Sequence, residues 1–203
     1  MIGKISFVGL FVVAVLFTAD APATLLLPDS SHYEGSTYYD IILVDGFLRG
    51  RIDFAVYDTL GGNEFLNAGY SAPGDGQFIY VYQIFNDYPL SDEAVAYFAI
   101  LGIQGAPVDG IGAEEDPSTG VEPSDEYFTP SEGVWQFDGG LVYAGEHSWF
   151  LVLTSDTDWV PGEYQITTAE DNPFPVPIPE PGMLTLLAIG TAMIIKKRKN
   201  SVG

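Results

Sequence analysis

Short apolar stretches alternate with turn-forming residues along most of this chain, and that alternation restricts the fold more than any other feature. Phe78–Phe85 is rich in aromatic and β-branched residues and lies between Gly76 and Asn86, which is typical of a β-strand. Arg51–Tyr57 has the period of two of a half-buried strand, with one face formed by Ile52, Phe54 and Val56. No apolar stripe with a helical period persists for three turns, so we expect an all-β chain.

Five more segments show the same strand pattern, namely Tyr39–Val44, Val95–Ile103, Val134–Phe137, Trp149–Thr154 and Tyr164–Thr167. Turn signals recur between the strand-like segments, at Asp45-Gly46, Gly61-Gly62, Asp138-Gly139-Gly140 and Pro161-Gly162. Short strands that follow one another through tight turns favour antiparallel pairing. The sequence therefore predicts an antiparallel β-sandwich, jelly-roll-like in type, as one domain over residues 24–171.

The acidic balance of charges excludes one large class of partners. The chain has 203 residues, with 28 acidic and 7 basic side chains, and most of the basic ones lie at the two ends. A body of this charge repels phosphate backbones, so we expect no nucleic-acid binding. Hydrophobic residues make up 47% of the chain, which is enough for a packed core. There is no cysteine, which excludes disulfides, thiolate metal ligands and a cysteine nucleophile.

The first 23 residues have the order of a secretory signal peptide. Lys4 supplies a positive start, and a predominantly apolar run follows at Ile5–Phe17. Cleavage after Ala21 would leave Pro22 beside the cut, and its fixed backbone suits a peptidase poorly, so we predict cleavage by signal peptidase after Ala23. The apolar run is shorter than the ~20 residues that span a bilayer, which favours a removable signal over a permanent anchor.

The C-terminal end combines a proline-rich run, an apolar stretch and a basic tail. Proline occupies every second position from Pro173 to Pro181, and we expect residues 172–182 to stand outside the sheet as an extended linker. The helix-capable stretch 183–195 covers ~20 Å, less than the ~30 Å hydrocarbon core of a bilayer. The tail at 196–203 should remain cytoplasmic by the positive-inside rule, because its cluster comprises Lys196, Lys197, Arg198 and Lys199.

Val176–Pro181, followed by the apolar helix and the basic tail, resembles the PEP-CTERM sorting signal of exported Gram-negative proteins. The resemblance covers residues 176–203. It implies that Pro179, Glu180 and Pro181 form a processing motif and that an exosortase-type membrane enzyme is a partner. It also implies that the C-terminal transmembrane-like helix anchors the chain in the membrane only transiently. Proteins of this family accompany exopolysaccharide and biofilm production, which implies a final place at the cell surface or in the extracellular matrix. A plain C-terminal membrane anchor behind a proline linker is the alternative.

An acidic segment at residues 107–129 is nearly free of apolar side chains, so we expect a long solvated loop there. Calcium prefers several oxygen ligands, but this segment lacks the D-x-[DN]-x-[DN]-G spacing of a calcium loop. Asp156 and Asp158 are a second calcium candidate, because alternate carboxylates can face one turn, although both residues are also ordinary turn formers. We expect no cofactor, with calcium as the alternative.

Sequence motifs of common enzymes are missing. His32 and His147 are the only histidines, no H-E-x-x-H occurs, and Gly69–Pro73 begins like the G-x-S-x-G elbow but ends in proline. Glycoside hydrolysis uses a pair of carboxylates, but in a chain with 28 acidic residues some pair will lie at a suitable distance by chance, so such a pair does not indicate this activity. We therefore expect a protein that is not an enzyme, and a glycan-active enzyme ranks third among our hypotheses.

Aromatic side chains suggest an alternative function, because exposed rings stack on the apolar faces of sugars. We expect Trp135 and Trp149 to fill the core, and Trp159, beside Asp158, to be the exposed ring. The leading hypothesis is a non-enzymatic exported protein of the cell surface or polysaccharide matrix. The alternative is a carbohydrate-binding module that holds exopolysaccharide, with or without the help of calcium.

Overall fold

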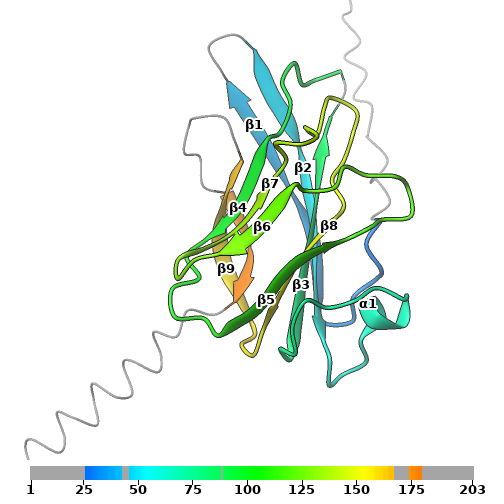
Figure 1. Ribbon diagram of the computed structural model, residues 1–203, viewed down its shortest axis with the longest axis vertical. Coiled ribbons are helices and arrows are strands. Elements are labelled where there is room, and N and C mark those ends of the chain that lie inside the picture. The colour runs from blue at the N-terminus through cyan, green and yellow to red at the C-terminus, as the bar shows by residue number, and fades with distance from the viewer. Residues whose placement is uncertain (1–25, 43–45, 88, 167–173, 180–203) are drawn as a thin grey trace, which may run out of the picture.

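The computed structural model describes residues 26–42, 46–87, 89–166 and 174–179, which form two antiparallel five-stranded sheets (Figure 1). The first sheet has the order β1 (Tyr33–Ile42), β2 (Phe47–Asp58), β3 (Phe78–Asn86), β8 (Phe150–Ser155) and β5 (Val108–Glu114). The second has the order β10 (Phe174–Pro179), β9 (Trp159–Ile166), β4 (Tyr97–Leu101), β7 (Glu132–Gln136) and β6 (Asp125–Phe128). The predicted signal helix and C-terminal helix lie outside the described residues.

The two sheets pack face to face and bury the main core between them. Trp135 of β7 is fully buried at its centre, and its ring stacks on Phe98 of β4 with the centroids 5.8 Å apart. The ring of Tyr82 in β3 meets Trp135 from the opposite sheet at 6.1 Å. Trp135 also donates from Nε1 to the carbonyl oxygen of Gly112 in β5 at 2.8 Å. These strands and this core confirm the expectation of an all-β chain.

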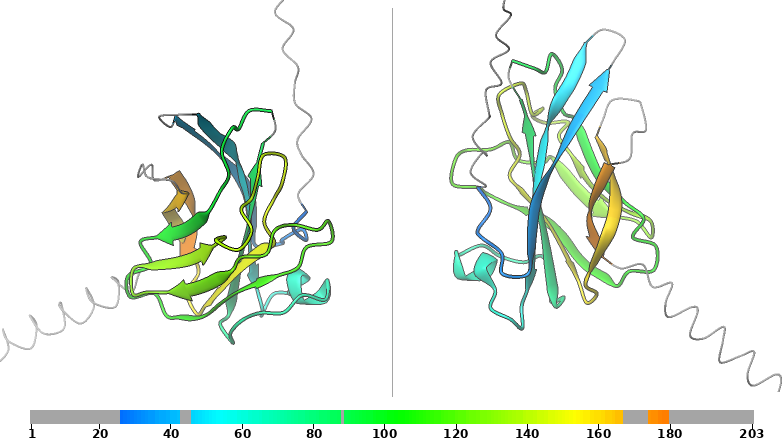
Figure 2. Two further views of the ribbon diagram at one scale, coloured as in Figure 1. Left: turned by 45° about the horizontal axis from the view of Figure 1, so that its top comes forward. Right: turned by 180° about the vertical axis from the view of Figure 1, so that it is seen from behind.

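A second apolar cluster covers the outer face of the first sheet, where Tyr57 and Phe150 are fully buried. Its cover comes from the connection between β2 and β3, which contains the helix α1 (Glu64–Asn67). The side chain of Asn63 caps this helix, and Phe65 packs its ring 5.4 Å from Tyr57. Figures 1 and 2 show α1 on the far side of the first sheet from the second sheet. The central strands β2, β3 and β8 are therefore buried on both faces, whereas the outer face of β1 is exposed.

Residues 107–129 do not form one long loop, which corrects the expectation from composition. They contain β5 and β6, the outer strands of the two sheets. β5 pairs with β8, and its Ile111 and Ala113 pack against the core. Glycines and acidic residues hide this strand in the sequence, because its position is set by hydrogen bonds to β8 and by a few small apolar contacts. All four residues of β6 are exposed, so they show no period-two pattern.

The described part of the proline-rich run is also not outside the sheet, because Phe174–Pro179 is the edge strand β10 beside β9. Pro177 lies opposite Pro161, and neither residue has an N–H, so this is a non-hydrogen-bonded pair of the ladder. Ladder bonds alternate along an antiparallel strand. Pro175 and Pro179 therefore occupy the same kind of position, and their missing N–H groups fall on the side away from β9. Proline at every second residue fits an edge strand for this reason.

Candidate functional site

Of the predicted processing motif, the structure describes Pro179, which is the last residue of β10. Glu180 and Pro181 follow directly and lie outside the described residues, as do Ala21, Ala23 and the basic cluster at 196–199. The sandwich thus extends to the first residue of the motif. We take the surface around the end of β10 as the candidate functional site.

An aromatic corner, defined here as Tyr33, Phe54 and Trp159, lies where β10 ends. Trp159 is the first residue of β9 and the ladder partner of Pro179. Its ring stacks on Tyr33 of β1 with the centroids 3.8 Å apart, and Tyr33 stacks on Phe54 at 5.9 Å. Trp159 is half-buried, and Tyr33 covers one of its faces. The expected exposed ring is therefore part of the junction between the two sheets.

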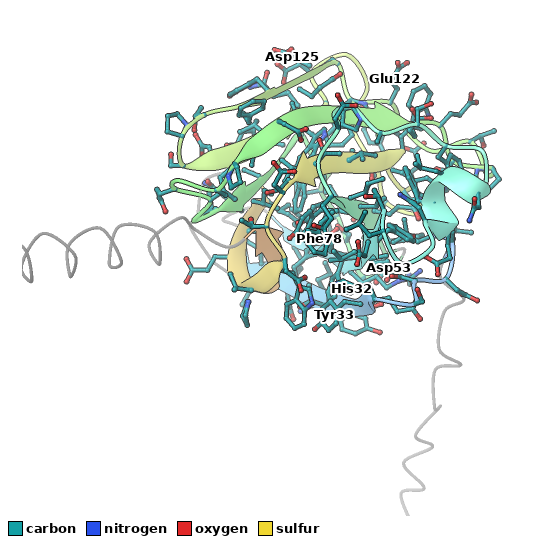
Figure 3. All side chains as sticks on the ribbon, turned by 90° about the horizontal axis from the view of Figure 1, so that it is seen from below. His32, Tyr33, Asp53, Phe78, Glu122 and Asp125 are labelled. Atoms are coloured by element: carbon teal, nitrogen blue, oxygen red, sulfur yellow. The ribbon has the colours of Figure 1, made fainter. Side chains whose placement is uncertain are left out.

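His32 and Asp158 lie beside the aromatic corner and contact each other. His32 Nε2 lies 2.7 Å from Asp158 Oδ1, and the same oxygen accepts the backbone N–H of Trp159 at 2.7 Å. The His32 ring lies 5.4 Å from the ring of Phe78 at the start of β3. Figure 3 shows His32, Tyr33 and Phe78 close to one another, beside the start of β9. These contacts join the start of β1 to the turn that leads into β9, which stiffens the body at the end of β10.

The two calcium candidates have separate partners. Asp158 contacts His32, whereas Asp156 Oδ1 accepts the backbone N–H of Gln77 at 3.3 Å. Within the described ranges, no three His, Cys, Asp or Glu side chains gather where they could hold a metal ion. In the acidic segment, Glu122 and Asp125 lie on the opposite side of the molecule from His32 (Figure 3). This geometry lends no support to a calcium site at Asp156 and Asp158.

A buried polar cluster on the outer face of the first sheet escaped the sequence analysis. Asp116 is its centre: Oδ1 accepts the backbone N–H of Ser118 at 2.6 Å, and Oδ2 lies 3.2 Å from Gln83 Nε2 and 3.0 Å from His147 Nε2. Gln83 also donates to the carbonyl oxygen of Ser148 at 3.1 Å. The side chain of Asp116 is fully buried. Gln83 and His147 are distant from Asp116 in sequence, so no local motif could have revealed these contacts.

Serine, histidine and aspartate meet in this cluster, but not in the geometry of a proton relay. Ser118 Oγ and Asp116 Oδ2 both lie 3.0 Å from the same ring nitrogen, Nε2 of His147. A relay requires the carboxylate on one ring nitrogen and the hydroxyl on the other. The hydroxyl of Ser118 also contacts Asp116 Oδ1 directly, at 2.8 Å. The cluster therefore fastens the segment between β5 and β6 to the first sheet.

A second buried carboxylate, Asp53 of β2, is compensated by a neighbouring cation. Asp53 Oδ1 accepts from Arg51 Nε at 3.0 Å and from the Ser36 hydroxyl at 2.6 Å, and the Arg51 guanidinium lies 3.9 Å from the centre of the Phe85 ring. Gln83 is the ladder partner of Asp53 on β3. Asp53 Oδ2 and Gln83 Oε1 are buried without a hydrogen-bond partner. Such acceptors destabilise a fold, by about 1–3 kcal/mol each.

An open pocket of about 280 Å³ lies between the β4–β5 connection and the end of β6. Its lining is mainly apolar and includes Ile103, Ala106, Val108, Phe128 and Pro130. Phe128 is 45% exposed, and its neighbour Tyr127 is 38% exposed. An exposed ring beside an apolar hollow is a surface on which a sugar can stack.

Comparison of the chain with protein-family models, with curated proteins and with solved structures finds no match. In the part of the chain that the structure describes, no helix has the length and the apolar character needed to cross a bilayer. A function for the protein is therefore inferred from its own residues: the order of the predicted signals at its two ends, and the position of Pro179 at the end of β10.

Proposed function

We propose that this chain is a non-enzymatic exported protein, sorted by an exosortase-type enzyme to the cell surface or the extracellular polysaccharide matrix of a Gram-negative bacterium. Signal peptidase removes residues 1–23, and the apolar stretch 183–195 holds the chain in the inner membrane until the motif Pro179–Pro181 is processed. The observation that carries this proposal is the order of motif, apolar stretch and basic cluster at the C-terminal end.

The structure of the body is consistent with display outside the cell. The sandwich and the motif adjoin directly, because β10 ends at Pro179. The chain has a formal net charge of −21, which keeps a displayed domain soluble and disfavours its adhesion to anionic membranes. The buried Asp116 and Asp53 clusters hold segments of the sandwich together. Their contacts support a structural role.

The substitution Glu180→Ala tests sorting. In a host with an exosortase-type system, we expect the wild-type chain to lose the residues after the motif and the Glu180→Ala chain to keep them, because Glu180 distinguishes the motif from a simple proline linker. Intact mass and cell fractionation measure both outcomes. Glu115→Ala removes one exposed charge from the body and should be processed like the wild type. A wild-type chain that retains Lys196–Lys199 would leave only a plain membrane anchor.

A second function, carbohydrate binding, is favoured by the exposed ring of Phe128 beside the apolar pocket. If the pocket binds exopolysaccharide, Phe128→Ala should weaken retardation in polysaccharide affinity gels about 2- to 10-fold, as expected for loss of one ring contact. Tyr38→Ala removes a ring that is 68% exposed on β1 and serves as the matched control. Gels run with calcium and with a chelator show whether calcium assists. Equal migration of the wild type with and without polysaccharide rejects this function.

A further inference from the structure

We propose that β10 acts as a gate on tail processing: while it is docked on β9, Pro179, the first residue of the processing motif, is held in the sheet, and the sorting enzyme acts on the undocked state. This inference rests on the proposed function, because it assigns a regulation to the same motif. It follows from the ladder register, from the spacing of the prolines and from the stiffness of the aromatic corner.

The register places Pro179, the first residue of the motif, in the ladder of the folded body. Phe174 pairs with Tyr164 at one end of the ladder, and Pro179 pairs with Trp159 at the other. No residue of slack therefore separates the sandwich from the motif. Trp159 is held in turn by its stack on Tyr33 and by Asp158, which contacts His32. A docked β10 thus holds Pro179 at a fixed point, and β9 covers the edge of β10 with which it pairs.

The outer edge of docked β10 is poor in hydrogen-bond donors. The pair of Pro177 with Pro161 is non-hydrogen-bonded, so the N–H groups of Phe174, Val176 and Ile178 point toward β9. The outward positions are prolines, which have no N–H to offer. An enzyme that recognises an extended substrate through its backbone, by adding it as a strand, finds its donors only after β10 has left β9. The same proline edge also blocks pairing between copies of the chain.

Release of β10 does not require the sandwich to unfold. β10 has one ladder partner, β9, and only every second residue of β10 can donate to it. β9 keeps its other partner, β4, through four residue pairs when β10 leaves. Edge elements of this kind open locally at a much smaller cost than the whole domain. The gate therefore opens on its own, and its equilibrium sets the fraction of chains that are ready for processing.

Two opposite substitutions test the gate in the full-length chain. Val176→Pro removes an N–H that points toward β9 and should favour the undocked state about 5- to 30-fold, with an equal rise in the rate of tail removal. Pro175→Ala, its matched control, restores an N–H on the outward side and should leave the rate unchanged. The double substitution Pro175→Cys with Glu163→Cys places two cysteines at a non-hydrogen-bonded pair, whose Cα atoms are about 4.5 Å apart, so a disulfide can form. This disulfide should block tail removal until reductant is added.

Pulse-chase labelling with intact mass measures the rate of tail removal, and hydrogen exchange of the purified chain measures docking without any enzyme. We expect slow exchange at the Val176 and Ile178 amides, lost at Ile178 in Val176→Pro while Leu151 in β8 stays protected. Fast exchange at both amides in the wild type overturns docking. Slow exchange with equal processing rates in all variants overturns the gate and leaves the sorting proposal intact. A wild-type chain that is never processed overturns the sorting proposal, and the gate with it.

Discussion

Replacing Trp135 with alanine should lower the free energy of unfolding by about 3–5 kcal/mol, the loss expected for a large aromatic side chain at the centre of a packed core. Trp135 is fully buried and contacts Phe98 within its own sheet and Tyr82 from the other. Its Nε1–H is also the donor for the carbonyl oxygen of Gly112. The substitution therefore opens a cavity between the sheets and leaves a carbonyl of the edge strand β5 without this partner.

Urea unfolding of the body, followed by far-UV circular dichroism, measures this loss. Trp135→Phe keeps most of the ring packing and removes the hydrogen bond to Gly112, so its loss should be smaller than that of the alanine variant. Tyr143→Ala is the matched control, because this ring is 58% exposed and its removal should change stability by less than about 0.5 kcal/mol. Equal losses in Trp135→Ala and Tyr143→Ala would contradict the assigned core.

The body should also lose stability steeply above pH 10. Burial raises the pKa of four core tyrosines above the ordinary value of 10.0, namely Tyr39, Tyr57, Tyr82 and Tyr164. Burial raises the pKa of Tyr97 to about 12, with Glu132 adding to the effect. The unfolded chain therefore releases these protons at a lower pH than the folded body. The stabilisation is complete below pH 10 and falls as the pH rises toward the folded values, by about 1.4 kcal/mol per pH unit for each fully buried tyrosine.

Urea midpoints measured at intervals from pH 9 to pH 11.5 test this pH dependence. Tyr82→Phe removes one ionisable group from a fully buried position and keeps its ring. We expect the stability of this variant to fall less steeply between pH 10 and pH 11, by about 1.4 kcal/mol per pH unit. The comparison uses slopes, so a constant loss from the missing hydroxyl does not affect it. A slope equal to that of the wild type would show that Tyr82 ionises equally well in both states.

The central strands were predictable because their side chains alone define them. Arg51–Tyr57 and Phe78–Phe85 lie within β2 and β3, and Trp149–Thr154 matches β8 to one residue at each end. These strands carry large apolar residues that are buried in the core or beneath α1. The confirmed burial of Trp135 belongs to the same class of prediction. Trp149 is half-buried and only partly fills the expected role.

Three of the four edge strands were missed because their structure comes from their neighbours, whereas the prediction at Tyr39–Val44 overlaps the fourth, β1. β5 contains Gly110 and Gly112, β6 is wholly exposed, and β10 is rich in proline. Composition assigns all three to loops, yet each has a partner strand that supplies its hydrogen bonds. The alternate spacing of the prolines was the one local clue, since it matches the alternation of inward and outward N–H groups on an edge strand.

The polar clusters required the sheet order itself. Asp116 meets His147 and Gln83 only because β8 lies between β3 and β5 in the first sheet. The sequence distances between these residues carry no periodic signal. The proposed processing motif is the opposite case, because its order of residues is readable without any structure, whereas the pairing of its first residue, Pro179, with β9 is not.

The strand order also dictates when the sandwich can be completed. β8 joins β3 to β5, so the first sheet stays open along β3 until residues 150–155 arrive. The second sheet likewise waits for β9 to cover the free edge of β4. If the chain crosses a membrane from its N-terminus, as proposed, the β1-β2-β3 meander and the β6-β7 and β9-β10 hairpins can form from local contacts. The pairings of β8 with β3 and β5, and of β4 with β7 and β9, are non-local and slow. Both sheets are therefore completed late, when nearly the whole body is available, and until then the open edges of β3 and β4 are exposed to pairing with other chains.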